Sequence, residues 1–317
     1  MESQIHRQAI VPDVLAYKRL DQIAAELFPE YSRSRIQGWI KGGQLLVDGG
    51  QRRSSEQLEG GEQILIDATL QDIEAVAEPV ELNIIYEDDE LLVINKRSDL
   101  VVHLGPGNYS GTILNGLLHH DRSLALLPRG GIVHRLDKGT TGLMVVAKTL
   151  SSQTDLIDQL QKRTVKRIYE AVVHGKPEQP GKVDAPIGRH HAQRTRMAVR
   201  SNGKPAITHY AITNRFEAHS HLELRLETGR THQIRVHMQH IGYPLVGDLT
   251  YGGHHRTLRG GSEIVQQVLD NFDRPALHAK RLSLVHPGTG REMTWKAETP
   301  ADLAELIDTL AADASRQ

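Results

Sequence analysis

The chain has 317 residues, of which 38% are hydrophobic and 24% charged, with a formal net charge of −1 and no cysteine. That length suits one large domain or a few smaller ones, and the lack of cysteine excludes disulfides, thiolate metal sites and cysteine nucleophiles. No apolar run approaches the ~18 residues of a membrane span, and the N-terminus lacks the pattern of a signal peptide. We therefore expect a soluble cytoplasmic protein without a membrane partner.

The first part of the chain, residues 13–68, predicts a compact unit of two helices and short strands. Residues 18–28 carry apolar side chains at helical spacing, and Ser32 is a suitable N-cap for a second helix. The segment QLLVDGGQRR, residues 44–53, predicts a strand, a tight Asp-Gly turn and a returning strand. Residues 69–80 have little periodicity, and we interpret them as a linker.

The remainder, residues 81–317, predicts one larger domain. Its elements are a hairpin, a helix, a buried strand, a helix capped by Ser151 or Ser152, several further strands, a closing hairpin and a terminal amphipathic helix. Strands outnumber helices, and hairpins join many of them. The sequence therefore predicts an α+β protein with a large, mostly antiparallel mixed sheet flanked by helices, preceded by a small N-terminal α/β unit.

One aspartate in the segment GIVHRLDKGTTGLMVVAK stands just before an apolar strand. An aspartate before a Thr-rich turn is usually a cap or turn residue, but Arg135 stands two residues before Asp137, and the strand behind would hold a site rigidly. Ordinary glycosidases need two carboxylates, and no second one is obviously paired with this one. The order of DKGTTG also differs from the phosphorylated DKTGT segment of ion-pumping ATPases. The remaining chemistry is a lone nucleophilic or proton-abstracting aspartate, held ionised by an arginine.

Three histidines, His232, His237 and His240, are the candidates for a metal site. If this segment were a strand, positions 232 and 237 would point to opposite faces, and no pair of carboxylates is close in the sequence. A metal site is therefore the less favoured interpretation.

Four segments in order resemble the RluA family of pseudouridine synthases, from about residue 80 to 298. They are LLVINKRSDLVVH, GIVHRLDKGTTGLMVVAK, KRIYEAVVHGK and LRLETGRTHQIRVHMQHIGYPLVGDLTYG. The second resembles the HRLD signature of that family, and the third its tyrosine motif. The N-terminal segment RLDQIAAELFPEYSRSRIQGWIKGGQLLVDGG resembles an S4 RNA-binding domain. Together these resemblances cover nearly the whole chain and imply a pseudouridine-synthase fold behind an S4-like domain.

The resemblance also implies a role for each matched position. Asp137 would be the catalytic aspartate, Tyr169 would stack on the target uracil, and Arg235 would pair with Asp137. Arg135 would fill the space left by a flipped-out nucleotide, and Ile234 would line the base pocket.

Two questions remain open at this point. Arg230 competes with Arg235 as the partner of Asp137. Strand alternation disfavours Arg230 slightly, because positions 230 and 235 differ by an odd number and would point to opposite faces of a strand. Clusters of basic side chains are expected to hold RNA beside the tyrosine and in the S4-like unit. These are Lys166 and Arg167, with Arg33, Arg35 and Lys41.

Within the family, the motifs most resemble the members that act on large-subunit ribosomal RNA. The resemblance implies an isomerase that forms pseudouridine in 23S rRNA or a large-subunit precursor, in the stem-loop called helix 69, with no cofactor and no metal. We expect a monomer. The alternatives are a related synthase for another rRNA or tRNA site, an RNA-binding ribosome-assembly factor, and a hydrolase of small molecules with an aspartate nucleophile.

Overall fold

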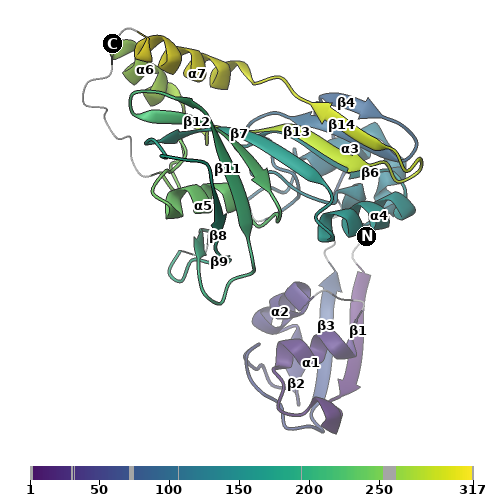
Figure 1. Cartoon of the computed structure of the whole chain (residues 1–317). Helices are drawn as coiled ribbons and strands as arrows, with labels where there is room; N and C mark the ends of the chain where they lie inside the picture. The colour runs from purple at the N-terminus through teal and green to yellow at the C-terminus, as the bar shows by residue number, and fades with distance from the viewer. Residues whose placement is uncertain are drawn as a thin grey trace. The chain divides into compact units, whose positions relative to one another are not determined.

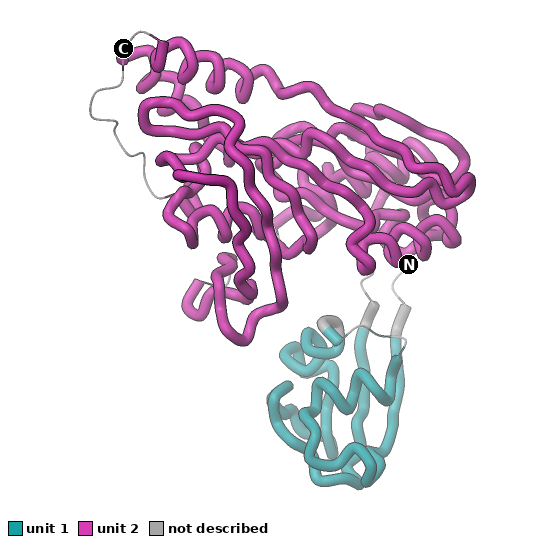
Figure 2. The backbone as a smooth tube through the Cα atoms, viewed as in Figure 1, with its two compact units in different colours: residues 1–74 teal, residues 75–317 magenta. Residues whose placement is uncertain are grey.

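The computed structural model describes residues 3–29, 31, 33–70, 75–105, 107–193, 195–252 and 262–315, except for the side chains at 3, 4, 34, 35, 69 and 70. The chain divides into two compact units, Met1–Glu74 and Ala75–Gln317, which Figure 2 colours separately. Within the described ranges, no helix is long and apolar enough to cross a membrane.

The first unit is a three-stranded antiparallel sheet with two helices packed on it. The strands lie in the order β1-β3-β2, and the helices bury one apolar face against them. Leu20, Ile23, Ile36, Ile40 and Ile64 are fully buried in this core. The elements are β1 (Ser3–Ile10), the short 3-10 helix η1 (Asp13–Leu15), α1 (Leu20–Leu27), α2 (Arg33–Gly42), β2 (Leu45–Val47) and β3 (Gln63–Leu70).

The two predicted helices of this unit are confirmed, but the predicted returning strand is wrong. β2, which precedes the Asp-Gly turn, pairs with β3. Residues 51–53, which follow the turn, are polar and exposed and form no strand. β1 was not anticipated, since its sequence SQIHRQAI has only a weak alternation of apolar side chains. Ser32, the expected helix cap, lies outside the described residues.

The second unit is built on a mixed sheet of nine strands within the described residues. Eight strands follow the order β4-β5-β6-β13-β7-β12-β11-β8, and β14 pairs with β13. The β6–β13 pair is parallel, and the other pairs are antiparallel. The strands are β4 (Ile84–Glu87), β5 (Leu91–Lys96), β6 (Thr141–Ala147), β7 (Lys166–His174), β8 (Gly181–Asp184), β11 (Ile207–Arg215), β12 (His219–Leu226), β13 (Leu277–Val285) and β14 (Glu292–Lys296), beside a separate hairpin of β9 (Ile187–Arg189) and β10 (Met197–Val199).

Helices cover both faces of this sheet, as Figure 1 shows. Alternate residues of β6 point to opposite faces, so Met144 packs with α3 and α5 while Val145 packs with α4. Helices α6 and α7 lie together over Val172. The helices are α3 (Ile113–His120), α4 (Leu150–Gln161), α5 (Gln233–His240), α6 (Glu263–Asn271) and α7 (Ala301–Ala314), with short 3-10 helices η2 (Arg122–Leu126) and η3 (Pro128–Gly131).

The predicted fold class is confirmed, with local corrections. α4 is capped by Thr149, whose hydroxyl accepts a hydrogen bond from the Ser152 N–H (3.1 Å), and not by either predicted serine. α6 and the strands from β8 to β11 were not anticipated. The segment HQIRVH is a helix, α5, so the strand-alternation arguments for its histidines and arginines do not apply.

Candidate active site

Asp137 lies in the loop that leads into β6, and the loop is fastened beside it. The carbonyl of Asp137 accepts a hydrogen bond from the Thr140 N–H (3.1 Å). Lys96, which ends β5 and is 2% exposed, donates from Nζ to the carbonyls of Lys138 and Arg97, both at 2.8 Å. Burial lowers the pKa of Lys96 to about 7, although the charge of Asp137 opposes this. The loop is thus tied to β5 at the residue after the aspartate.

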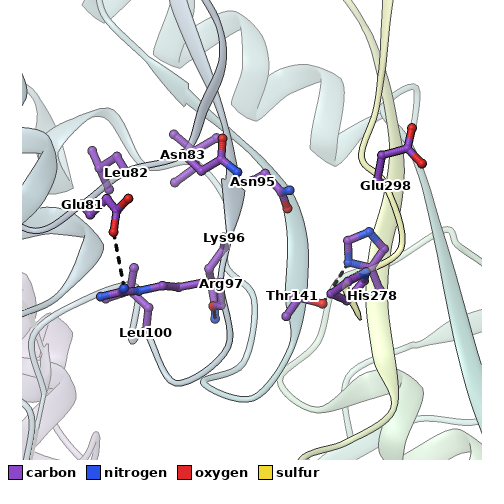
Figure 3. Close-up of a pocket in the computed structure, with 12 residues that line it drawn as sticks. Glu81, Leu82, Asn83, Asn95, Lys96, Arg97, Leu100, Thr141, His278 and Glu298 are labelled. Carbon is purple, nitrogen blue, oxygen red and sulfur yellow. Dashed lines mark hydrogen bonds and ion pairs between the residues drawn. The ribbon is translucent and has the colours of Figure 1, made fainter. Parts of the chain in front are cut away.

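A pocket of about 290 Å³ lies beside Lys96, with Glu81, Asn83, Asn95, Thr141 and His278 among its lining residues. Figure 3 shows Glu81 facing Arg97 and the Thr141 hydroxyl paired with His278 Nδ1 at 2.9 Å. None of the residues predicted to be catalytic lines this pocket. Through Lys96, whose Nζ donates to the Lys138 carbonyl, the pocket borders the loop of Asp137 without including the aspartate.

Arg235 joins two carboxylates from α5. Its Nη1 donates to Asp137 Oδ2 at 3.3 Å, while its Nε and Nη2 donate to Asp248 at 2.6 and 2.8 Å. Burial lowers the pKa of Arg235, but the hydrogen bonds to Asp248 and the charges of both carboxylates outweigh burial and raise it. Asp248 is 2% exposed and also accepts the N–H groups of Thr250 and Tyr251. The geometry therefore pairs Asp137 with Arg235, as predicted.

Arg230 does not take this place. It is exposed, and its Nε donates to the carbonyl of Pro205 at 3.1 Å. The reason lies in the chain path, because Arg230 precedes α5 while Arg235 lies within it. The alternation argument reached the same choice for a wrong reason.

Tyr169 lies on β7 with its side chain directed into the core, 5% exposed. Burial is the largest influence and raises the pKa of its phenol; the charge of Arg167 lowers that pKa, and the charge of Asp137 raises it. Both charged groups therefore lie close enough to act on the tyrosine. Tyr169 also shares a buried core cluster with Leu136 and Ile234, the sequence neighbours of Asp137 and Arg235, so the three residues lie in one region.

His232 and Tyr251 also lie beside Asp137 and Arg235; the sequence singled out His232 only as a candidate metal ligand, and Tyr251 not at all. His232 has a left-handed backbone (φ 56°) at the start of α5, its Nδ1 is 2.7 Å from the Tyr251 hydroxyl, and its Nε2 is 3.8 Å from Asp137 Oδ1. The Arg235 guanidinium lies over the Tyr251 ring, 4.9 Å from its centroid. Burial lowers the pKa of His232, although Asp137 raises it. The imidazole of His232 therefore faces the carboxylate of Asp137.

The histidines considered as metal ligands do not converge. His237 is buried and hydrogen-bonds through its ring nitrogens to the Thr208 hydroxyl and the Ala185 carbonyl, both at 2.9 Å, whereas His240 is exposed. Across the described ranges, no group of three His, Asp or Glu side chains is arranged to hold a metal ion.

The remaining predicted residues differ in accessibility. Arg135 is exposed two residues before Asp137, and Ile234 is 4% exposed beside Arg235. Lys166 is exposed and pairs with Glu292 (2.8 Å), whereas Arg167 is only 8% exposed.

In the first unit, Arg33 pairs with the buried Asp21 at 2.9 Å and Lys41 is exposed. The side chain of Arg35 lies outside the described residues.

The expectation that Arg167 belongs to a basic surface is wrong. Its side chain is only 8% exposed, because alternation along β7 turns this residue to the core side with Tyr169.

The chain matches the model of the RNA pseudouridylate synthase family over residues 90–240 and that of the S4 domain over residues 18–64. It is 53% identical to "Ribosomal large subunit pseudouridine synthase D" of Pseudomonas aeruginosa, over 99% of this chain and 98% of that protein. The chain belongs to the RNA pseudouridylate synthase family. It is 52% identical to the protein of the same name from Escherichia coli K12, over 99% of this chain and 97% of that protein.

The solved structure titled "Human RNA Pseudouridylate Synthase Domain Containing 4" covers 72% of this chain, and this chain covers 93% of it, at 25% identity and a TM-score of 0.55. These findings confirm the resemblance to pseudouridine synthases and the S4 domain drawn from the sequence. The protein is thus an RNA pseudouridine synthase. The sequence analysis did not identify Asp248 as a site residue. The only signal for it was its position in the segment PLVGDLTYG, which belongs to the fourth resembling segment.

Proposed function

We propose that this enzyme converts specific uridines of large-subunit (23S) ribosomal RNA to pseudouridine during ribosome biogenesis, in the helix 69 stem-loop. The names of the relatives that match nearly the whole chain support the RNA class. The observation that carries the chemistry is the ion pair of Asp137 with Arg235, which Asp248 fixes from behind at 2.6 and 2.8 Å.

The reaction moves the uracil from a nitrogen to a carbon attachment. The bond between ribose C1′ and N1 breaks, and a bond between C1′ and C5 forms. No electrons are transferred overall and no group is donated, so the reaction itself requires no redox cofactor, phosphate donor or metal. Asp137 would attack C1′, remove a ribose proton or add to C6 of the base, and Arg235 would hold its carboxylate ionised and oriented.

The base must leave the RNA stack to reach this site. Unstacking costs a few kcal/mol, and stacking on Tyr169 and insertion of the exposed Arg135 would offset part of that cost. Ile234 would line the base pocket. Because these side chains enclose the base, water would be excluded while the glycosidic bond is open.

RNA outside the pocket would be held by basic side chains. In the S4 domain these would be Arg33, Arg35 and Lys41, and in the catalytic domain Lys166 would contribute from the start of β7. Each phosphate contact to a single strand would add about −0.7 to the slope of log affinity against log salt. We infer a monomeric cytoplasmic enzyme with an S4-like domain at 13–68, a linker at 69–80 and a catalytic domain at 81–317.

The test is incubation of the wild-type protein and of Asp137→Asn with unmodified large-subunit rRNA, followed by carbodiimide-blocked primer extension. Stops confined to helix 69 and absent with the variant support the proposal. Stops elsewhere discard the helix 69 target. Absence of stops on rRNA, ribosomal particles and tRNA would favour an assembly factor.

A further inference from the structure

Arg167 is a buried cation that the proposed steps leave unused on the catalytic face of the sheet. It precedes Tyr169 by two positions on β7, so both side chains point to the same face. Tyr169, Ala171 and Val173 continue this row into the core. Arg167 itself is 8% exposed, so it does not lie on the RNA-facing surface like its neighbour Lys166.

Arg167 differs from the other buried arginines in having no acidic partner. Arg235 is held by Asp248 and Asp137, and Arg274 by Asp302. In the part of the chain that the structure describes, the side chain of Arg167 forms no ion pair or hydrogen bond, and its Nε is buried without a partner. A buried charge without a partner is costly to the fold, and an unsatisfied buried polar group in a native structure calls for an explanation, of which a catalytic role is one.

The surroundings of Arg167 show where such a ligand would lie. Its charge acts on the phenol of Tyr169 and on His134, whose Nε2 accepts the Val145 N–H. On another side the guanidinium approaches the loop after β12, where a Cβ added to Gly229 would lie 2.7 Å from Arg167 Nη1. The guanidinium therefore lies against the backbone of Gly229, on the face of β7 that also carries Tyr169.

Building on the proposed function, we propose that Arg167 is a further catalytic residue that donates hydrogen bonds to a carbonyl oxygen of the target uracil while the base is detached from the ribose. When the C1′–N1 bond breaks, its electron pair leaves with the base and spreads over N1 and the carbonyl oxygens. The pair then forms the C1′–C5 bond, C5 loses its proton and N1 gains one. Arg167 neither gains nor loses a proton.

Position favours the base over a phosphate as the partner of Arg167, because Arg167 lies two residues from Tyr169 on the same face of β7. Phosphates stay at the protein surface, where water solvates their charge, whereas the flipped base is the part of the nucleotide that stacks on Tyr169. A preorganised donor in a dry site stabilises charge that develops during the reaction. Arg167 would therefore raise the rate of the chemical step and contribute little to the affinity for RNA.

The test is Arg167→Gln under single-turnover conditions, on the RNA in which wild-type protein forms pseudouridine. Release of tritium from [5-³H]uridine measures the step, and Kd is measured separately. We expect a rate lowered by about 100-fold, with Kd changed by less than about 3-fold. Gly229→Ala keeps the arginine but displaces its guanidinium, and its rate should fall in the same direction. Arg281→Gln is the matched control, since this arginine lies on β13 opposite Ile168, is 38% exposed and pairs with Glu223.

RNA containing 5-fluorouridine separates stabilisation of the base from a merely structural role. Fluorine withdraws electrons and stabilises the detached base, so formation of its C1′–C5 bond should depend less on Arg167. Because C5 of this base carries fluorine instead of a proton, no proton leaves C5, and the product is followed as a rearranged nucleoside that keeps its fluorine, by digestion to nucleosides and chromatography. The inference would be overturned if Arg167→Gln lowered the rate by the same factor on both substrates. It would also be overturned if the variant lost affinity equally for RNA whose target nucleotide lacks its base. Inactive wild-type protein would overturn the proposed function as well, whereas active wild type with an unaffected Arg167→Gln overturns this inference alone.

Discussion

Replacing Asp248 by asparagine tests whether the orientation of Arg235 controls the catalytic carboxylate. Asp248 accepts the Nε and Nη2 hydrogens of Arg235 at 2.6 and 2.8 Å, in a site where it is 2% exposed. Asparagine has the same shape, but its amide group turns a donor toward one of the two guanidinium hydrogens. Arg235 would then keep one of these two hydrogen bonds, and its contact with Asp137 would lose its support.

The magnitude follows from the lost contact. A hydrogen bond to a charged group contributes about 1.5–3 kcal/mol, which corresponds to a kcat lowered roughly 10- to 100-fold. The free energy of unfolding should also fall, by about 3–5 kcal/mol if the uncompensated guanidinium stays buried. Affinity for RNA should change little, because Asp248 is covered by protein.

Multiple-turnover tritium release at saturating RNA, RNA binding and urea unfolding measure these three effects. Asp302→Asn is a matched control, because Arg274 donates to Asp302 at the same 2.6 and 2.8 Å through the same nitrogen atoms. The control should lose stability while keeping most of its kcat. An Asp248→Asn protein with kcat within about 3-fold of wild type would refute the idea that this pair orients the site.

Three further outcomes are expected. Lys96 has a pKa of about 7 in the folded protein and near 10.5 in the unfolded chain. At pH values between these two, unfolding therefore takes up a proton. Stability should therefore rise with pH across that window, by at most about 1.4 kcal/mol per unit from this group, and urea unfolding of Lys96→Met should show a flatter pH dependence. Tyr169→Leu should lower kcat by about 10-fold or more and weaken base stacking by about 1–3 kcal/mol. The prediction fails if RNA with 2-aminopurine beside the target gives the same fluorescence change on binding the variant as on binding the wild type. Lys41→Gln should raise Kd and reduce the salt slope by about 0.7, with an unchanged kcat at saturating RNA.

The parts of the site that follow local pattern could be predicted from the sequence. The HRLD segment before an apolar run placed Asp137 at the start of a buried strand, and KRIYEAVVHGK placed Tyr169 on another strand. Such runs are decided by neighbouring residues, so a single sequence contains the information. The strand β1 escaped notice because its stability comes from pairing with β3, about sixty residues away.

The contacts between distant segments could not be predicted in the same way. Asp248 follows Arg235 by thirteen positions, and nothing in its local pattern separates a buried ion-pair partner from a turn aspartate. Arg167 was expected to be a surface contact because it belongs to a basic run, yet alternation along β7 buries it. Both cases depend on which face of an element meets the core, and a charge count does not show this.

The two carboxylates around Arg235 are not equivalent, and the difference supports Asp137 as the one that we propose reacts. Asp248 has a side chain with no exposure, and its oxygens accept four hydrogen bonds, from Arg235 and from the N–H groups of Thr250 and Tyr251. Asp137 retains 16% exposure and has one longer contact with the same guanidinium, at 3.3 Å. A carboxylate with four short contacts would lose them on moving toward a ribose, whereas Asp137 would lose little. The same arginine therefore fixes one aspartate and leaves the other free to meet the substrate.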